Sequence, residues 1–191
     1  MAASGCRLVS LQTDLFSSPQ DRQLMQETQQ RIQSMAQLHE LLYQSSDFQS
    51  INLNEYIGAI LAELMIEYNA VGGQIRVVKS ITDICVSLEV ALPVGLIVNE
   101  LLSNSLKYAF PASRGGLLEI AAVRVGERIT LTVSDDGIGL PVGLSISGSS
   151  SLGFLLVDSL TGQLGGTVTR LNGAGTCIQL DFPARELSCP K

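Results

Sequence analysis

Hydrophobic and polar positions repeat with a helical period in residues 93–110. The apolar positions of this repeat are Leu96, Ile97, Leu101, Leu102 and Leu106. Glu100, Asn104 and Lys107 recur at plus four and plus three and therefore share the other side of the predicted helix. A polar stripe of this kind is typical of a solvated helix face. The same three groups can also serve proton transfer, a metal ion and an anion, so the pattern alone leaves both interpretations open.

A longer helical pattern covers residues 18–45. It begins with a capping hydroxyl at Ser18, a proline at the first helical position and a carboxylate, Asp21, three residues after the cap. Its apolar stripe consists of Leu24, Thr28, Ile32, Met35, Leu38 and Leu42. Gln and Glu fill most other positions, so this helix needs a partner helix or a dimer mate to cover the stripe. Residues 1–12 hold no complete periodic unit and are interpreted as the end of a truncated element.

Helical and strand-like patterns alternate along the rest of the chain. Residues 54–69 predict a helix that ends at Gly72-Gly73, and residues 152–164 predict another that ends at Gly165-Gly166. The strand-like runs are residues 74–80, 84–89, 117–125, 128–134, 167–171 and 176–182. Residues 136–151 are rich in Gly and Ser and predict a mobile loop. This order of elements predicts an α+β fold.

Composition narrows the class of protein. Of the 191 residues, 46% are hydrophobic and 16% are charged, as expected for one globular domain with an appendage. The net charge of -6, without a run of Lys and Arg, excludes a nucleic-acid-binding role. The longest apolar run, near residues 90–98, is about half of the roughly 20 residues that a membrane-spanning helix needs. The four cysteines lack metal-site spacing, and we expect Cys85 and Cys177 to act as small apolar residues in a reducing, cytoplasmic setting.

Two glycine clusters bracket the predicted loop. Asp135-Asp136-Gly137-Ile138-Gly139 follows a predicted strand, and Ser151-Leu152-Gly153 begins a predicted helix. A carboxylate at a strand end can accept a hydrogen bond from the exocyclic amine of adenine, and glycines let the backbone approach the base. Free N–H groups at a helix start can bind phosphates. Each cluster alone is also typical of a plain turn, but the combination indicates a nucleotide site.

Four motifs in this order carry a family resemblance: Asn99-Glu100-x-x-x-Asn104-Ser105-x-Lys107-Tyr108, Asp135-x-Gly137-x-Gly139, Ser151-Leu152-Gly153 and Gly173-x-Gly175-Thr176. Together they resemble the ATP-binding domain of sensor histidine kinases, within the GHKL ATPase superfamily. Residues 31–45, which contain Leu-His-Glu-Leu-Leu-Tyr-Gln-Ser, and residues 51–57 resemble the second dimerisation helix and linker of one bacterial subgroup of these kinases.

The resemblance implies a two-layer α/β sandwich of the Bergerat type, a mixed sheet with helices on one face. It divides the chain into a partial dimerisation segment (residues 1–48), an ATP-binding catalytic domain (49–187) and a tail (188–191). It also implies ATP and Mg²⁺ as cofactors, a response-regulator receiver domain as partner, and a homodimer in the full-length protein.

The resemblance further assigns a role to each motif residue. Asn104 is the expected Mg²⁺ ligand, and Glu100 is the expected proton acceptor or water-positioning residue. Lys107 and Tyr108 would face the phosphates, and Asp135 would bind adenine. The remaining expected nucleotide contacts are Gly137, Gly139, Leu152, Gly153 and Thr176.

The chain departs from the family pattern at two places. The acceptor histidine of the family would precede the first matching residues, near Leu8, so we expect a segment outside this chain to supply it. The usual Gly-x-Gly of the second cluster reads Ser151-Leu152-Gly153, which reduces flexibility on the phosphate side. The single histidine, His39, is expected to be a residue near the dimerisation interface, and the alternative is that it accepts phosphate.

Three functions remain open at this stage. The first is the catalytic part of a histidine kinase that binds ATP but cannot phosphorylate itself. The second is a non-catalytic GHKL module that senses a nucleotide or changes partner contacts. The third is a serine-directed GHKL kinase, which the dimerisation-helix resemblance disfavours.

Overall fold

The computed structural model describes residues 50–69, 74–111, 114–140 and 151–184, together with Ser18, Met25, Thr28, Gln29, Gln33, Ala36 and Ile146. The prediction for His39, and most of the predicted helix at residues 18–45 and of the predicted loop at residues 136–151, therefore lie outside the described residues. Within the described residues, no helix is both long and apolar enough to cross a membrane.

A five-stranded mixed sheet forms one layer of the fold. Its strands are β2 (Ile75–Ile81), β4 (Gly116–Val125), β5 (Arg128–Asp135), β6 (Thr167–Leu171) and β7 (Cys177–Pro183), in the spatial order β2-β4-β5-β7-β6. Only the β2–β4 pair is parallel, and the other three pairs are antiparallel. Two short strands, β1 (Ile51–Asn52) and β3 (Cys85–Val86), form a separate antiparallel pair.

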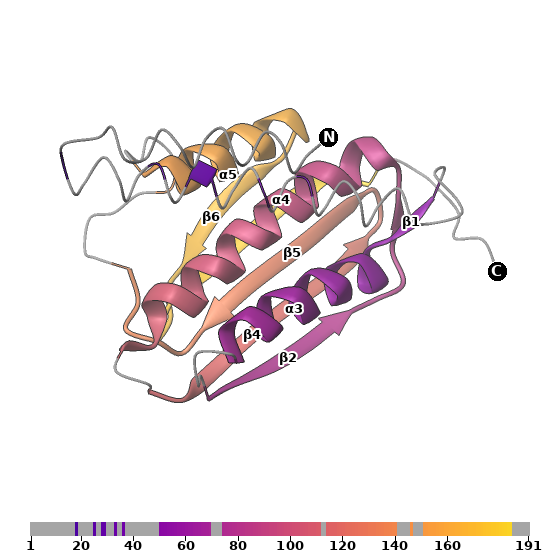
Figure 1. The fold of residues 1–191 in the computed structure, drawn as a ribbon. Helices are drawn as coiled ribbons and strands as arrows, with labels where there is room; N and C mark the ends of the chain where they lie inside the picture. Colours follow the sequence, from indigo (N-terminus) through magenta and orange to yellow (C-terminus); the bar gives the residue numbers. More distant parts are fainter. Residues whose placement is uncertain are drawn as a thin grey trace.

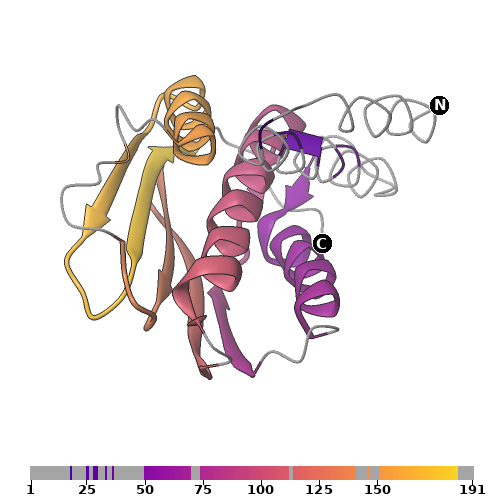
Figure 2. The ribbon, with the colours of Figure 1, turned by 60° about the vertical axis from the view of Figure 1, so that its left-hand side comes forward.

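Among the described residues, three helices form the second layer. They are α3 (Leu53–Asn69), α4 (Leu88–Asn104) and α5 (Leu152–Gln163), and all three lie over the same face of the sheet (Figures 1 and 2). This arrangement confirms the predicted two-layer sandwich with helices on one face. A π-helix, η2 (Ser105–Ala109), continues α4 directly.

The alternation of side chains along the strands explains why the layers pack. In β4, β5 and β7 every second residue points toward the helices and is buried: Leu118, Ile120, Ala122, Ile129, Leu131, Val133, Ile178, Leu180 and Phe182. Burial of one such large apolar side chain contributes roughly 1.5–3 kcal/mol. The predicted strand runs at residues 117–125, 128–134, 167–171 and 176–182 are confirmed to within one residue.

Helix α4 is longer than predicted at its start. The pattern predicts a helix from Pro93 and a strand over residues 84–89, but the strand contains only Cys85–Val86 and the helix begins at Leu88. Ser87 is the N-cap, and its carbonyl accepts the backbone N–H groups of Val90 and Ala91 at 3.0 and 2.8 Å. Pro93 lies in the second turn of α4, where it has no N–H to donate to the preceding turn.

Helices α3 and α4 approach each other closely at Tyr56. A Cβ added at Gly95 would lie 2.2 Å from the Tyr56 hydroxyl oxygen, so only glycine fits opposite this ring. The Tyr56 side chain is 6% exposed. Its hydroxyl has no hydrogen-bond partner in the described part of the chain, and burial raises its pKa above the ordinary value.

The two described strand cysteines differ. Cys177 is a free thiol, whereas Cys85 is buried in β3 and disulfide-bonded. The prediction that Cys85 acts only as a small apolar residue is therefore wrong.

Candidate nucleotide site

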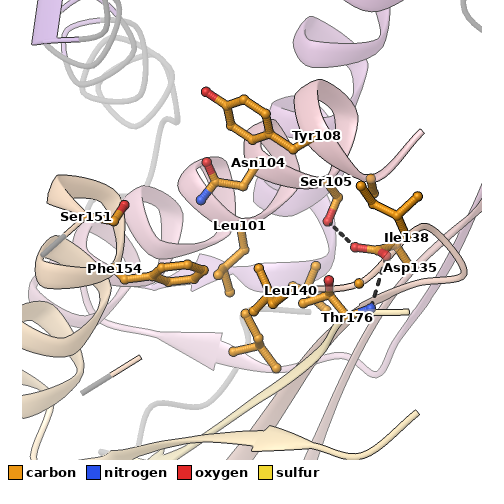
Figure 3. Close-up of a pocket in the computed structure, with 14 residues that line it drawn as sticks. Leu101, Asn104, Ser105, Tyr108, Asp135, Ile138, Leu140, Ser151, Phe154 and Thr176 are labelled. Carbon is orange, nitrogen blue, oxygen red and sulfur yellow. Dashed lines mark hydrogen bonds between the residues drawn. The ribbon is translucent and has the colours of Figure 1, made fainter. Parts of the chain in front are cut away.

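A cavity of about 720 Å³ lies where the end of α4 meets the sheet and the start of α5 (Figure 3). The helical wall consists of Leu101, Asn104, Ser105, Tyr108 and Ala109. The sheet and the loop after β5 contribute Val133, Asp135, Ile138, Gly139, Leu140, Thr176 and Ile178. Ser151 and Phe154 close the side toward α5. The cavity is large enough for a nucleotide-sized ligand and has mainly apolar walls with a few polar groups, as small-molecule sites usually have.

Asp135 is the most extensively bonded polar group of the cavity. It ends β5, its side chain is 7% exposed, and its Oδ1 accepts the backbone N–H groups of Gly137 and Thr176, both at 3.1 Å. Its Oδ2 accepts the Ser105 hydroxyl at 2.7 Å. The Asp135 backbone N–H also donates to the Thr176 carbonyl at 2.8 Å, so the two residues hold each other. Hydrogen bonds to a carboxylate are stronger than neutral ones, and here they fix its orientation before any ligand binds.

Two glycines make this arrangement possible. A Cβ at Gly137 would lie 2.4 Å from the Ala109 carbonyl oxygen, and a Cβ at Gly175 would lie 2.1 Å from the Asp135 carbonyl oxygen. Both clashes are with backbone atoms, which cannot move aside as a flexible side chain can. Gly139 has a φ of 74°, which favours glycine for a different reason. The predicted importance of the glycines in this cluster thus has a steric explanation.

The π-helix η2 forms the contact between α4 and the Asp135 loop. The Ala109 carbonyl accepts the Ile138 N–H at 3.0 Å, and Ser105 at the other end of η2 bonds Asp135. The sequence pattern predicts a regular helix through residue 110 and does not detect this change of winding. Single π-turns inside helices occur frequently at functional sites.

Ser105 lines the cavity, but the sequence pattern did not predict a role for it. It follows Leu101 by four residues and Leu102 by three, so it lies on the buried stripe of the helix. A polar side chain on a buried stripe needs a hydrogen-bond partner, and this requirement is the signal that could have identified it. The apolar wall residues, such as Phe154 and Leu140, carry no comparable signal because tertiary packing alone brings them to the cavity.

The other end of the cavity has fewer fixed contacts. The half-buried Asn104 extends from α4 into this region between Phe154 and Tyr108 (Figure 3). Helix α5 begins after Ser151, whose hydroxyl makes no capping bond to the helix. The Phe154 ring is buried and faces the cavity. This end therefore offers one carboxamide and one helix start.

The predicted site residues fall into two groups. Those that line the cavity are Asn104, Tyr108, Asp135, Gly139 and Thr176. Those that do not are Glu100, Lys107, Gly137, Leu152 and Gly153.

The second group differs in burial. Gly137 lies beside the cavity, because its N–H bonds Asp135. Leu152 and Gly153 follow directly after Ser151 at the start of α5, with Leu152 exposed and Gly153 buried. Glu100 is buried on α4, and Lys107 is exposed on η2.

Asp136, the residue after Asp135, has a structural role. Asp136, which the pattern predicts to be a solvated loop residue, is exposed, but its Oδ1 accepts the Leu117 N–H at 2.8 Å and holds the start of β4. The prediction is thus incomplete.

Burial raises the pKa of the Cys177 thiol, and the charges of Asp135 and Glu119 raise it further. The thiol therefore stays protonated at neutral pH and is a poor nucleophile.

A metal ion has few protein ligands in this region. The described residues contain no group of three or more His, Cys, Asp or Glu side chains that could hold a metal. Mg²⁺, however, commonly binds through one or two protein oxygens together with substrate phosphates and water. The Asn104 carboxamide in the cavity fits a Mg²⁺ ion that arrives with a nucleotide, and does not fit an all-protein site.

Comparison with known proteins identifies the relatives of both parts of the chain. Residues 89–186 match the family described as histidine kinase-, DNA gyrase B- and HSP90-like ATPases, and residues 6–68 match a family described as histidine kinase. The chain is 32% identical over 185 residues to the sensor histidine kinase PdtaS of Mycobacterium tuberculosis. The aligned region covers 93% of this chain and 36% of the relative. It is 33% identical over 157 residues to the blue-light-activated histidine kinase 2 of Erythrobacter litoralis, which covers 75% of this chain and 44% of the relative.

Solved structures agree on the fold. The histidine kinase domain of the Erythrobacter litoralis EL346 blue-light-activated histidine kinase superposes with a TM-score of 0.73 at 22% identity, covering 94% of both chains. The catalytic domain of the histidine kinase ThkA superposes with a TM-score of 0.60 at 16% identity, covering 72% of this chain and 97% of that one. The chain spans less than half the length of these two curated relatives, 36% and 44%. The family match, which extends over more than half of the residues, shows that the chain belongs to the histidine kinase-, DNA gyrase B- and HSP90-like ATPases.

Proposed function

We propose that this chain is the ATP-binding catalytic part of a two-component sensor histidine kinase. In this role it binds Mg-ATP and transfers the γ-phosphate to a histidine on another segment, for relay to an aspartate of a response regulator. The observation that carries the proposal is the Asp135 carboxylate, held by three hydrogen-bond donors in a cavity of about 720 Å³. The names of the relatives, sensor histidine kinases, support the same function.

Asp135 would accept a hydrogen bond from the adenine amine. Gly137 and Gly139 would shape the base pocket, and Thr176 would support its floor. The apolar walls formed by Leu101, Ile138, Leu140, Phe154 and Ile178 suit a planar base, since they remove its faces from water.

The phosphates would lie toward Asn104 and the start of α5. Asn104 would hold Mg²⁺, which supplies charge stabilisation on the phosphate oxygens when it is bound. Lys107 and Tyr108 are both exposed on η2, where they can reach a triphosphate that extends out of the cavity. The N–H groups of Leu152 and Gly153 would add an anion site.

Glu100 is the expected proton acceptor or water-positioning residue. Its side chain is buried one helical turn before Asn104, and it does not line the cavity. The replacement of the usual Gly-x-Gly by Ser151-Leu152-Gly153 leaves room for the second candidate function, a non-catalytic GHKL module that binds a nucleotide and changes partner contacts. The two functions differ in whether phosphate leaves the nucleotide.

The expected partners follow from the family. Residues 6–68 match a family described as histidine kinase, and this match supports residues 1–48 as a dimerisation segment in a homodimeric, cytoplasm-facing kinase. A receiver domain would accept the phosphoryl group. A segment outside this chain would supply the acceptor histidine.

A labelling experiment tests the proposal and separates the two functions. The purified chain is incubated with γ-labelled ATP and Mg²⁺, alone and with an upstream segment that carries an exposed histidine. We expect ATP binding by calorimetry, no label on the chain alone, and acid-labile label on the added segment. ATP binding without any transfer would favour the nucleotide-sensing module. Label on the chain that disappears in His39→Gln would instead identify His39 as the acceptor, and absence of ATP binding would contradict both functions.

A further inference from the structure

Ser105 donates a hydrogen bond to the carboxylate that is expected to bind the base. Its side chain is 7% exposed, and its Oγ lies 2.7 Å from Asp135 Oδ2 across the junction between η2 and the end of β5 (Figure 3). Ser105 and Asp135 both line the cavity. The pair therefore stands at the cavity wall, where the position of one carboxylate oxygen affects a ligand directly.

The hydrogen bonds that Asp135 already accepts leave its carboxylate with one acceptor site for a ligand. A carboxylate has about four acceptor sites, two on each oxygen. The N–H groups of Gly137 and Thr176 occupy the two on Oδ1, and the Ser105 hydroxyl occupies one on Oδ2. The remaining acceptor site is on Oδ2, the oxygen that Ser105 holds.

The remaining site sets a chemical requirement on the ligand. An ionised carboxylate can only accept, so the ligand must present a donor, such as an exocyclic amine, at this point. A ligand that presents only a carbon-bound hydrogen there gains no hydrogen bond. Without the Ser105 hydroxyl, the N–H groups of Gly137 and Thr176 still hold Oδ1, but both acceptor sites of Oδ2 are open and the direction that faces the ligand is no longer fixed.

We propose that Ser105 is a positioning residue for base selection, which orients Asp135 Oδ2 toward the exocyclic amine of the bound purine. This inference rests on the proposed ATP-binding function and adds a residue to it. Ser105 acts through Asp135 and touches neither the phosphates nor the metal. Its contribution is therefore tied to one functional group of the ligand, the amine at position 6.

The test compares two nucleotides that differ only at that group. Calorimetry measures the affinity of the parent, Ser105→Ala and Ser103→Ala for ATP and for purine riboside triphosphate, which carries a hydrogen in place of the amine. Ser103 is the matched control, because it lies two residues earlier, at the end of α4, is half-buried and does not line the cavity. We expect Ser105→Ala to weaken ATP by roughly five- to tenfold and purine riboside triphosphate by less than about twofold. This loss is smaller than that of a whole charge-assisted hydrogen bond, because Asp135 itself remains as the acceptor. Ser103→Ala should change neither affinity.

Other outcomes overturn the inference. Equal weakening of both nucleotides by Ser105→Ala would mean that the hydroxyl only supports the local structure, and unchanged affinity for both would mean that it has no role in binding. Ser105→Cys keeps a group at the γ position but donates a much weaker hydrogen bond, so it provides a second comparison if the alanine variant has a lowered melting temperature. It should show the same loss for ATP alone. Failure of the parent to bind either nucleotide would contradict the proposed function itself. If the parent binds both nucleotides and the variants do not discriminate between them, only the role of Ser105 is contradicted.

Discussion

The two ends of the cavity are built differently. At the end proposed to hold the base, Asp135 has three hydrogen-bond donors, and Gly137 and Gly175 pack so closely that a methyl group would meet backbone atoms. At the end proposed to hold the phosphates, Asn104 is half-buried and Lys107 is exposed. The contrast teaches that the chain itself fixes the shape of the base end, whereas the phosphate end depends more on what the ligand brings. Substitutions at the two ends should therefore fail in different ways.

Gly175→Ala should have the largest effect, because it disrupts the fixed end directly. The added Cβ would lie 2.1 Å from the Asp135 carbonyl oxygen and 2.8 Å from Oδ1. We expect a loss of stability of roughly 1–3 kcal/mol, typical of overpacking, together with loss of measurable ATP binding. Denaturant titration and calorimetry check the two parts. Gly173→Ala in the same hairpin is the control, since a Cβ there meets nothing within 4 Å. Equal effects of the two variants would refute the steric argument.

Asp135→Asn should weaken ATP while preserving the fold. The amide keeps one oxygen for the N–H groups of Gly137 and Thr176 but loses the charge and one acceptor. A hydrogen bond to a charged group is worth roughly 1.5–3 kcal/mol, so we expect about a ten- to hundredfold loss of affinity by calorimetry. Asp136→Asn provides the matched control, because that carboxylate holds the Leu117 N–H and faces away from the cavity wall. Unchanged ATP affinity in Asp135→Asn would remove its role in base binding.

Asn104→Ala tests the phosphate end. We expect a smaller loss, roughly five- to tenfold in the presence of Mg²⁺, because phosphate oxygens and water supply most ligands of such an ion. With EDTA present, the variant and the parent should bind ATP equally. The free energy of unfolding should change by less than about 0.5 kcal/mol, because the half-buried side chain faces the cavity and not the core. A large drop in the denaturant midpoint would instead identify Asn104 as a structural amide.

Tyr56→Phe should change stability slightly and binding not at all, since it lies at the α3–α4 contact outside the cavity. Its buried hydroxyl has no partner among the described residues, so its removal should leave the free energy of unfolding unchanged or raise it by about 1 kcal/mol. Because burial raises the pKa of Tyr56 above its ordinary value of 10.0, the folded state disfavours the phenolate. The parent should therefore lose stability as pH rises above the pKa of the unfolded chain, and the variant should lose less.

Denaturant titrations at pH 8 and pH 11 measure this difference. ATP affinity at pH 8 is the control and should match the parent. If Tyr56→Phe were destabilised at pH 8 by more than about 1 kcal/mol, the hydroxyl would have a stabilising partner such as a buried water.

Much of the sheet could be predicted from the sequence, because alternating residues in β4, β5 and β7 have one buried and one exposed face. The start of α4 could not, since residues 84–98 form a nearly continuous apolar run, in which a buried strand and a buried helix look alike. Ser87 followed by Glu89 in the first turn was the available signal for the helix start.

The sequence indicated residues at the cavity best where the backbone itself is constrained. Asp135 and the glycines around it stand out, because close backbone packing requires glycine there. Ser105 and Phe154 do not, since their positions depend on the π-turn and on the packing of α5, which no local pattern encodes.

The π-helix has a consequence for chain length. A π-turn closes its hydrogen bond one residue later than an α-turn, so η2 contains one residue more than an α-turn would. This extra residue lies between Ser105, which bonds Asp135, and Ala109, which bonds Ile138. Removal of one residue from Ser105–Ala109 would restore α-helical winding, yet one of these two contacts would be lost. Substitution of the exposed Lys107 or Tyr108 leaves both contacts in place. In this segment, the number of residues therefore constrains the chain more strongly than the identity of its exposed side chains.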